Sequence, residues 1–222
     1  MTSLSVPVLA LDGPSGSGKG TIGQLVALKQ GWHYLDSGAI YRGLSWLAQD
    51  QKVSADDSQG LIALADSMQL ICHIKAGDVA QIEINGNLVT DELRTEEIGE
   101  LASQIAPIEE VRRALFEMQR RCRKQPGLVA DGRDMGTVVF SDAKYKVFLT
   151  ASAEIRAQRR FEQLKAKGFD VNLARLLESI QARDVRDSSR ATSPLKAATN
   201  ACLLYTSPSP RDLSTTRMPS SA

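Results

Sequence analysis

Short apolar runs alternate along this chain with longer stretches whose apolar residues recur every three or four positions. The short runs are typical of buried strands, and they cover residues 6–11, 32–35, 127–130 and 146–149. Helical spacing follows the first run from about Ile22 and follows the second over residues 39–49. This alternation of strand and helix predicts an α/β fold, in which helices cover a parallel sheet and ligands bind at the carboxyl ends of its strands.

The pattern changes between residues 67 and 110. Apolar and polar residues alternate in segments 70–74 and 80–84, and the dipeptide Asn85-Gly86 follows. Alternation that ends in an Asn-Gly turn indicates antiparallel hairpins, and a helix is expected after them at about 95–105. We therefore expect a core formed by residues 1–66 and 111–201, with an inserted antiparallel subdomain at 67–110.

Residues 13–21, with the sequence Gly-Pro-Ser-Gly-Ser-Gly-Lys-Gly-Thr, join the first predicted strand to the first helix. Glycines let successive N–H groups face phosphate oxygens, the helix N-terminus adds its positive dipole, and Lys19 adds a mobile charge. The segment predicts a loop that binds a nucleoside triphosphate. A glycine turn that only starts a helix is the alternative, and it leaves the spacing and the lysine unexplained. The strict motif has Ser or Thr directly after the lysine, whereas here Gly20 precedes Thr21.

The Gly-Lys-Gly-Thr sequence resembles the loop of the nucleoside monophosphate kinases, which transfer the γ-phosphoryl group of ATP to a nucleotide's phosphate. Two more segments, Leu-Asp-Ser-Gly-Ala-Ile-Tyr-Arg at 35–42 and Ala-Asp-Gly-Arg-Asp-Met-Gly-Thr at 130–137, resemble signature segments of the bacterial cytidylate kinases. The resemblance extends from about residue 8 to about residue 198. It implies that the 67–110 subdomain binds the acceptor nucleotide and that a helical lid at about 152–170 closes over the triphosphate.

The same resemblance implies three groups of site residues. The catalytic group is Lys19, Arg133 and Arg183. The ATP-binding group is Gly13, Pro14, Ser15, Gly16, Ser17, Gly18, Lys19, Gly20, Thr21, Arg159 and Arg160. The CMP-binding group is Ser37, Arg42, Arg133 and Arg183 at the phosphate, Ser103, Arg112 and Asp134 at the base, and Asp187 and Arg190 near the ribose.

The chemistry of these side chains suits the implied roles. Guanidinium forks match the oxygens of a phosphate. Cytosine presents an amino donor beside the acceptors N3 and O2, so a carboxylate and two donors complement its edge. Exposed or salt-bridged helix faces remain the alternative for Arg42 and Arg183, and Ser103 and Arg112 are unremarkable apart from the resemblance. Magnesium is expected with ATP; Gly20 cannot bind it, and Asp36 and Asp131 are both candidates to hold it through water.

Composition agrees with an enzyme that acts on small molecules. The chain has 222 residues, 42% of them hydrophobic, with a net charge of +1, which gives no general attraction to nucleic acid or to membranes. Its three cysteines lack the spacing of a disulfide framework or a zinc site. No signal peptide or membrane-spanning run is evident. We expect a cytoplasmic monomer with ATP and CMP or dCMP as its ligands.

The last 21 residues, 202–222, have a different composition, since eleven of them are Ser, Thr or Pro. The resemblance implies a further strand and a long helix at this point. The segment is instead predicted to be disordered, and it resembles translated vector or adapter sequence, or a frameshift; a natural disordered tail is the alternative.

The functional hypothesis is a cytidylate kinase of pyrimidine nucleotide metabolism, which converts CMP and dCMP to the diphosphates. A monophosphate kinase for another base, such as uridylate, is the first alternative. A nucleotide-dependent switch protein is the second, and Gly20 argues against it because such a protein needs a magnesium-binding Ser or Thr there. A misassembled product, suggested by the tail, is the third.

Overall fold

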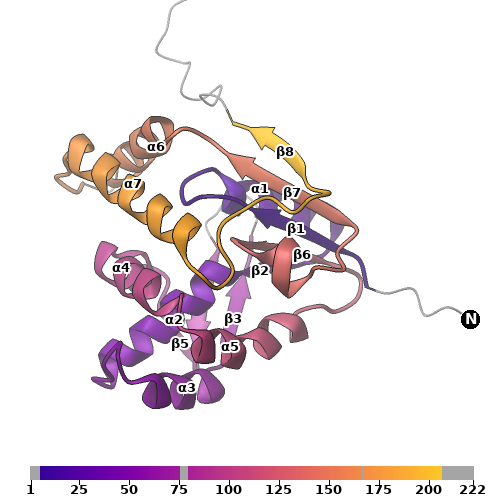
Figure 1. Ribbon diagram of the computed structural model, residues 1–222, viewed down its shortest axis with the longest axis horizontal. Coiled ribbons are helices and arrows are strands. Elements are labelled where there is room, and N and C mark those ends of the chain that lie inside the picture. Colours follow the sequence, from indigo (N-terminus) through magenta and orange to yellow (C-terminus); the bar gives the residue numbers. More distant parts are fainter. Residues whose placement is uncertain (1–5, 76–79, 167, 207–222) are drawn as a thin grey trace, which may run out of the picture.

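The computed structural model describes residues 6–75, 80–166 and 168–206 (Figure 1). Its larger sheet is parallel throughout, with the strand order β2-β6-β1-β7-β8. These strands are β1 Val8–Asp12, β2 His33–Asp36, β6 Leu128–Gly132, β7 Tyr145–Thr150 and β8 Cys202–Tyr205. The smaller sheet is antiparallel and consists of β3 Leu70–His73, β4 Gln81–Ile84 and β5 Asn87–Leu88. The prediction of an α/β fold with a small antiparallel sheet is therefore confirmed.

Helices connect most of the strands and pack against the larger sheet (Figure 1). They are α1 Lys19–Gln30, α2 Ser37–Asp50, α3 Ser58–Ser67, α4 Glu96–Ile105, α5 Glu109–Arg121, α6 Ala153–Ala166 and α7 Leu173–Ser189, with a 3-10 turn at Glu92–Arg94 and a π-helical turn at Met135–Val139. Local chemistry sets several of their ends. For example, Gly31 caps the C-terminus of α1 with a left-handed φ of 65°. Asp36 caps the N-terminus of α2, where its side chain accepts a hydrogen bond from the N–H of Ala39. Among the described residues, the helices are all too short or too polar to cross a bilayer.

Successive residues of the central strands face opposite sides of the larger sheet. Leu11 and Val129 pack against α1 on one side, whereas Ala10 and Ala130 join the main apolar cluster on the other. Both faces are thus covered, as expected for a parallel sheet whose strands read as continuous apolar runs.

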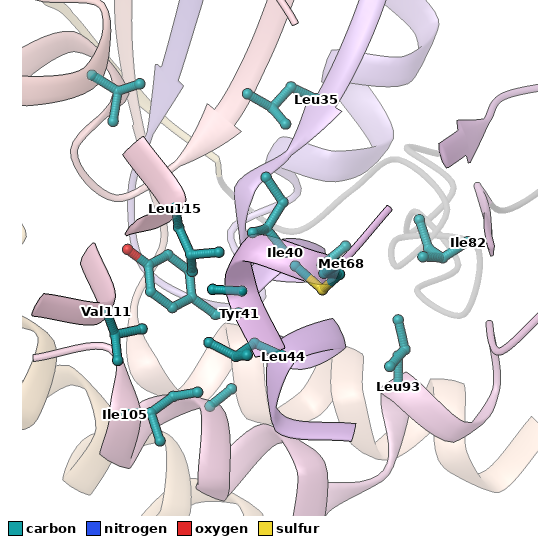
Figure 2. Close-up of a cluster of buried hydrophobic side chains, with 14 of the residues drawn as sticks. Leu35, Ile40, Tyr41, Leu44, Met68, Ile82, Leu93, Ile105, Val111 and Leu115 are labelled. Atoms are coloured by element: carbon teal, nitrogen blue, oxygen red, sulfur yellow. The ribbon is translucent and has the colours of Figure 1, made fainter. Parts of the chain in front are cut away.

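The main apolar cluster continues from the larger sheet into the inserted segment (Figure 2). Leu35 and Ile40 come from β2 and α2, Ile82 comes from β4, and Val111 and Leu115 come from α5. The hairpin turn has the positive φ angles predicted for Asn-Gly, 49° at Asn85 and 83° at Gly86. One continuous core therefore fixes the small sheet, α4 and α5 relative to α2.

The prediction of disorder from residue 202 onward is wrong for residues 202–206. Cys202–Tyr205 forms β8, which pairs in parallel with β7, and the N–H of Thr206 donates to the carbonyl of Thr150 at 2.8 Å. The physical reason is that β7 offers an unpaired edge of N–H and C=O groups, which a segment of apolar residues satisfies whatever the composition that follows. The rest of the predicted tail, 207–222, lies outside the described residues.

Candidate active site

The glycine-rich loop lies between β1 and α1, at the carboxyl end of the central strand of the larger sheet. Gly13 has a φ of 148°, and a Cβ there would lie 1.9 Å from the carbonyl oxygen of Leu149, so only glycine fits. Lys19 is the first residue of α1 and is buried. Its Nζ donates to the carbonyl of Pro14 at 2.8 Å, so the side chain folds back over the loop. This is the geometry of a phosphate-binding loop.

Lys19 and Asp131, the latter in β6, form a buried pair of opposite charge. Their Nζ and Oδ1 atoms are 3.9 Å apart, and the other oxygen of Asp131 accepts from the hydroxyl of Tyr34 at 3.2 Å. Burial, then repulsion from Arg133, lowers the pKa of Lys19 to about 7. Burial also raises the pKa of Asp131 to about 6. The loop is therefore a weakly hydrated site in which additional negative charge favours the charged lysine.

The carboxyl end of β2 brings two predicted residues to the same place. Ser37 is the first residue of α2, and its Oγ donates to Oε1 of Gln119 at 3.0 Å. Arg42 lies one and a half turns further, where its Nη2 donates to Asp36 at 3.2 Å. Both side chains therefore lie at the helix N-terminus, which favours an anion.

The carboxyl end of β6 continues with Arg133 and Asp134. Nε of Arg133 donates to Asp187 of α7 at 2.9 Å. Burial opposes ionisation of Asp187, but Arg133, Arg183 and Arg190 together hold the pKa of that carboxyl below its ordinary value. Asp134 forms a buried ion pair with Arg112 of α5, and Arg112 also donates to the carbonyl of Ala106 at 3.1 Å. A carboxylate and an arginine are thus held side by side at the cleft.

Helix α7 adds Arg183 and Asp187 to the same region, and Arg190 directly follows the helix. The pKa of Arg183 is lowered to about 10 by burial and then by the neighbouring Arg133. Among the described residues, Nε of Arg42, Nε of Arg183, and Nε and Nη2 of Arg190 are buried without a hydrogen-bond partner. Buried guanidinium donors with unused capacity, gathered in one place, are typical of a site that binds a phosphorylated ligand.

These elements enclose a cleft of about 690 Å³. The predicted site residues that line it are Ser15, Gly16, Ser17, Gly18, Lys19, Gly20, Thr21, Ser37, Arg42, Arg112, Arg133, Asp134, Arg159, Arg183, Asp187 and Arg190. The structure thus brings the glycine-rich loop and the arginine group into one cavity of a size typical for small-molecule sites.

Four predicted residues lie elsewhere. Gly13 and Pro14 form the start of the loop, outside the cleft lining. Ser103 is buried and its Oγ accepts from Nε of Arg186 at 3.2 Å. Arg160 donates to Glu96 at 2.8 Å and to the carbonyl of Arg94 at 3.2 Å, so it joins α6 to the start of α4. Their implied nucleotide contacts therefore remain predictions.

Sequence reasoning missed several polar residues that support the site. Asp12 ends β1 and binds the turn after Asp134, Gln119 holds Ser37, and Arg156 of α6 binds the glycine-rich loop. Gln119 had a visible signal, because it occupies the buried helical position that follows Val111 and Leu115 at intervals of four. Arg156 had none, since its partners in the loop and in α7, Ser15 and Asp184, are distant in the sequence.

Comparisons with known proteins agree with this geometry. A family model described as "Cytidylate kinase" matches residues 9–212. The cytidylate kinase of Methylococcus capsulatus is 53% identical over 203 residues, which cover 91% of this chain and 90% of that protein. The cytidylate kinase of Colwellia psychrerythraea is 52% identical over 89% of this chain and 87% of its own length. That of Pseudomonas aeruginosa is 53% identical, with coverages of 90% and 88%.

Proposed function

Because this chain belongs to the cytidylate kinase family, we propose that it transfers the γ-phosphoryl group of ATP to CMP and dCMP, giving CDP and dCDP. The observation that carries the proposal is the meeting of a phosphate-binding loop with a group of buried, incompletely paired arginines in one cleft. One nucleotide binds at each end, so the donor and acceptor phosphates face each other between Lys19 and Arg133.

The donor site is formed by the loop and the start of α1. N–H groups of residues 15–20 surround the β- and γ-phosphates, and Lys19 contacts both. Arg159 of α6 lines the cleft. Arg160 reaches the triphosphate when it exchanges its contacts with Glu96 and Arg94 for contacts with phosphate oxygens. The helical lid then holds the triphosphate away from water.

The acceptor site is formed by α2, the carboxyl end of β6, and α7. Ser37, Arg42, Arg133 and Arg183 hold the acceptor's phosphate. Asp134 accepts from cytosine's amino group while Arg112 donates to a ring acceptor, and the pair is already in contact before any base binds. Ser103 donates to the other ring acceptor, and Asp187 and Arg190 contact the ribose.

The donor set fits a magnesium ion that is bound mainly by phosphate oxygens and water. The described residues contain no group of three or more His, Cys, Asp or Glu that could hold a metal by themselves. Asp36 accepts from Ala39 and Arg42, Asp131 accepts from Tyr34 and pairs with Lys19, and both carboxylates line the cleft. Either of them would contact the ion through water. Bound magnesium neutralises charge on the β- and γ-phosphoryl oxygens.

Transfer then depends on position and charge. An oxygen of the acceptor's phosphate attacks the γ-phosphorus while the bond from that phosphorus to the β–γ bridging oxygen breaks, and ADP leaves. The acceptor is already an anion, so no general base is needed. Lys19, Arg133 and Arg183 face the oxygens on which charge is redistributed, and their burial strengthens each interaction.

The same proposal has the protein act on free nucleotides, as a monomer in the cytoplasm. Its near-neutral net charge gives no general attraction to nucleic acid or to a membrane surface. The test is a coupled assay of ADP formation with CMP, dCMP, UMP and AMP in turn. We expect CMP and dCMP to be preferred. A preference for UMP would favour the alternative of a uridylate kinase, and ADP formation without any acceptor would favour a nucleotide-hydrolysing switch.

A further inference from the structure

Asp12 is a buried carboxylate outside the cleft lining. It is the last residue of β1 and directly precedes the glycine-rich loop. Its two oxygens accept separate main-chain hydrogen bonds, from the N–H of Met135 at 2.8 Å and from the N–H of Gly136 at 2.7 Å. These are the first two N–H groups of the π-helical turn that follows Arg133 and Asp134.

The contact joins the parts of the chain that carry the two nucleotide sites. On one side is the strand that leads into the phosphate-binding loop, and on the other is the turn that follows the acceptor-binding arginine and aspartate. The strands β1 and β6 are neighbours with Asp12 opposite Gly132, but strand pairing ends there. Beyond that point, the side chain of Asp12 continues the connection to residues 135 and 136.

The need to fill space in the core does not explain why the Asp12 carboxylate is buried. Burial raises the pKa of Asp12 to about 6, although the hydrogen bonds from Gly136 and Met135 favour the charged form. Asp134 adds repulsion and Lys19 adds attraction, and the aliphatic part of Lys146 lies against Gly136 on the same side as an oxygen of Asp12. A neutral side chain would be easier to bury, but only a carboxylate offers two acceptors to two adjacent N–H groups.

We propose that Asp12 is a positioning residue for phosphoryl transfer, which fixes Arg133 and Asp134 relative to the phosphate-binding loop. The proposal rests on the proposed function and adds a residue that touches neither nucleotide. Its consequence is that the acceptor's base and phosphate are placed correctly for the γ-phosphorus only while both hydrogen bonds are present. Small displacements of reacting groups have large effects on rate, so loss of this one carboxylate is sufficient to slow phosphoryl transfer.

The first test is Asp12→Asn, which keeps the shape but directs an amide NH₂ at one of the two N–H groups. We expect kcat/KM for CMP to fall about 100-fold, as for a misplacement of about 1 Å, with a higher KM for CMP. The preference for CMP over UMP should fall about tenfold, because Asp134 is displaced from the base. The dissociation constant of an ATP analogue should change by less than about threefold, because the phosphate-binding N–H groups are not involved.

The control is Asp142→Asn, an exposed aspartate that pairs with Arg120 and Arg123 and lies away from the cleft. It removes the same charge and should leave the CMP:UMP ratio unchanged. If Asp12→Asn does not fold, as judged by circular dichroism, Asp12→Ser replaces it, since a hydroxyl still accepts one N–H without adding an opposing amide. A folded Asp12 variant with wild-type KM for CMP and wild-type CMP:UMP ratio would overturn the proposal. Failure of the wild type to phosphorylate CMP would instead overturn the proposed function.

Discussion

Replacement of Arg156 by methionine should lower the free energy of unfolding by about 3 kcal/mol. The Arg156 side chain is 4% exposed in α6, and its guanidinium pairs with Asp184 of α7. It also donates to the carbonyl of Ser15 in the phosphate-binding loop at 3.1 Å and to that of Ala151 at 3.0 Å. Methionine keeps the aliphatic part that packs against Gly16 but leaves these acceptors without their donor.

The magnitude follows from the burial of the two partners. Breaking a buried ion pair costs about 3–5 kcal/mol when the remaining charge cannot be hydrated. Asp184 is 29% exposed, so its carboxylate recovers part of its hydration and the lower end of that range applies. For a chain of this length, 1 kcal/mol changes Tm by about 2–4 °C, so we expect Tm to decrease by about 6–12 °C.

Thermal unfolding followed by circular dichroism and calorimetry measures the effect. The matched control is Arg160→Met, four residues later in the same helix, where the arginine is 32% exposed and pairs with Glu96, which is 62% exposed. Exposed pairs contribute about 0–1 kcal/mol, so Tm should decrease by less than about 4 °C. Equal decreases in the two variants would refute the reasoning, because burial would then make no difference to the pair.

Four further predictions concern the cleft. Lys19→Ala should lower kcat about 100-fold or more with an unchanged fold, because it removes a donor to the transferred phosphoryl group, and retention of more than about a tenth of the activity would contradict this. Asp134→Ala should weaken transition-state binding of CMP by about 1–3 kcal/mol while KM for ATP stays constant, since it removes both the base contact and the partner of Arg112. A rise in KM for ATP alone would argue against base recognition by Asp134. Arg133→Lys should strongly lower kcat/KM for CMP despite the retained charge, because an ammonium cannot bind Asp187 and two phosphate oxygens in one plane. Near-normal steady-state kinetics of this variant would exclude a role of Arg133 in holding the phosphate. Finally, the pKa of about 7 for Lys19 in the free protein should rise when a triphosphate binds, because the phosphates favour the charged lysine. Binding of an ATP analogue at pH 8, where the free lysine is largely neutral, should therefore be accompanied by proton uptake at Lys19, and this uptake should be smaller at pH 6. Titration calorimetry in two buffers of different ionisation enthalpy measures this uptake, and equal binding enthalpies at pH 8 would disprove it.

The local features of the fold were predictable because each has a short-range physical cause. Buried parallel strands need continuous apolar runs, which is why the run at 127–130 predicted the strand that the structure has as β6, Leu128–Gly132. Asn85 and Gly86 tolerate positive φ, so these two residues were enough to predict the turn of the hairpin. The glycine-rich loop was visible because phosphate binding needs glycine at fixed spacing.

The supporting contacts of the site were not predictable, because they join residues that no pattern connects. Arg156 and Asp184 are 28 positions apart, and Ser37 and Gln119 are 82 positions apart. The prediction failed at β8 for a related reason: composition describes what a segment can bury alone, whereas strand pairing depends on the free edge that β7 provides. Ser103 had the same difficulty, since the structure directs it to Arg186.

The strand order of the larger sheet has a consequence for how the protein is made. The two N-terminal strands do not pair with each other; β1 pairs with β6 and β7, and β2 pairs with β6. No two of the five strands can therefore pair until the chain has been synthesised to Gly132, the end of β6. Segments closer in sequence, such as α2 with α4 and β3 with β4, can associate earlier on the ribosome. The phosphate-binding loop, although encoded near the start, is among the last parts of the molecule to acquire its structure.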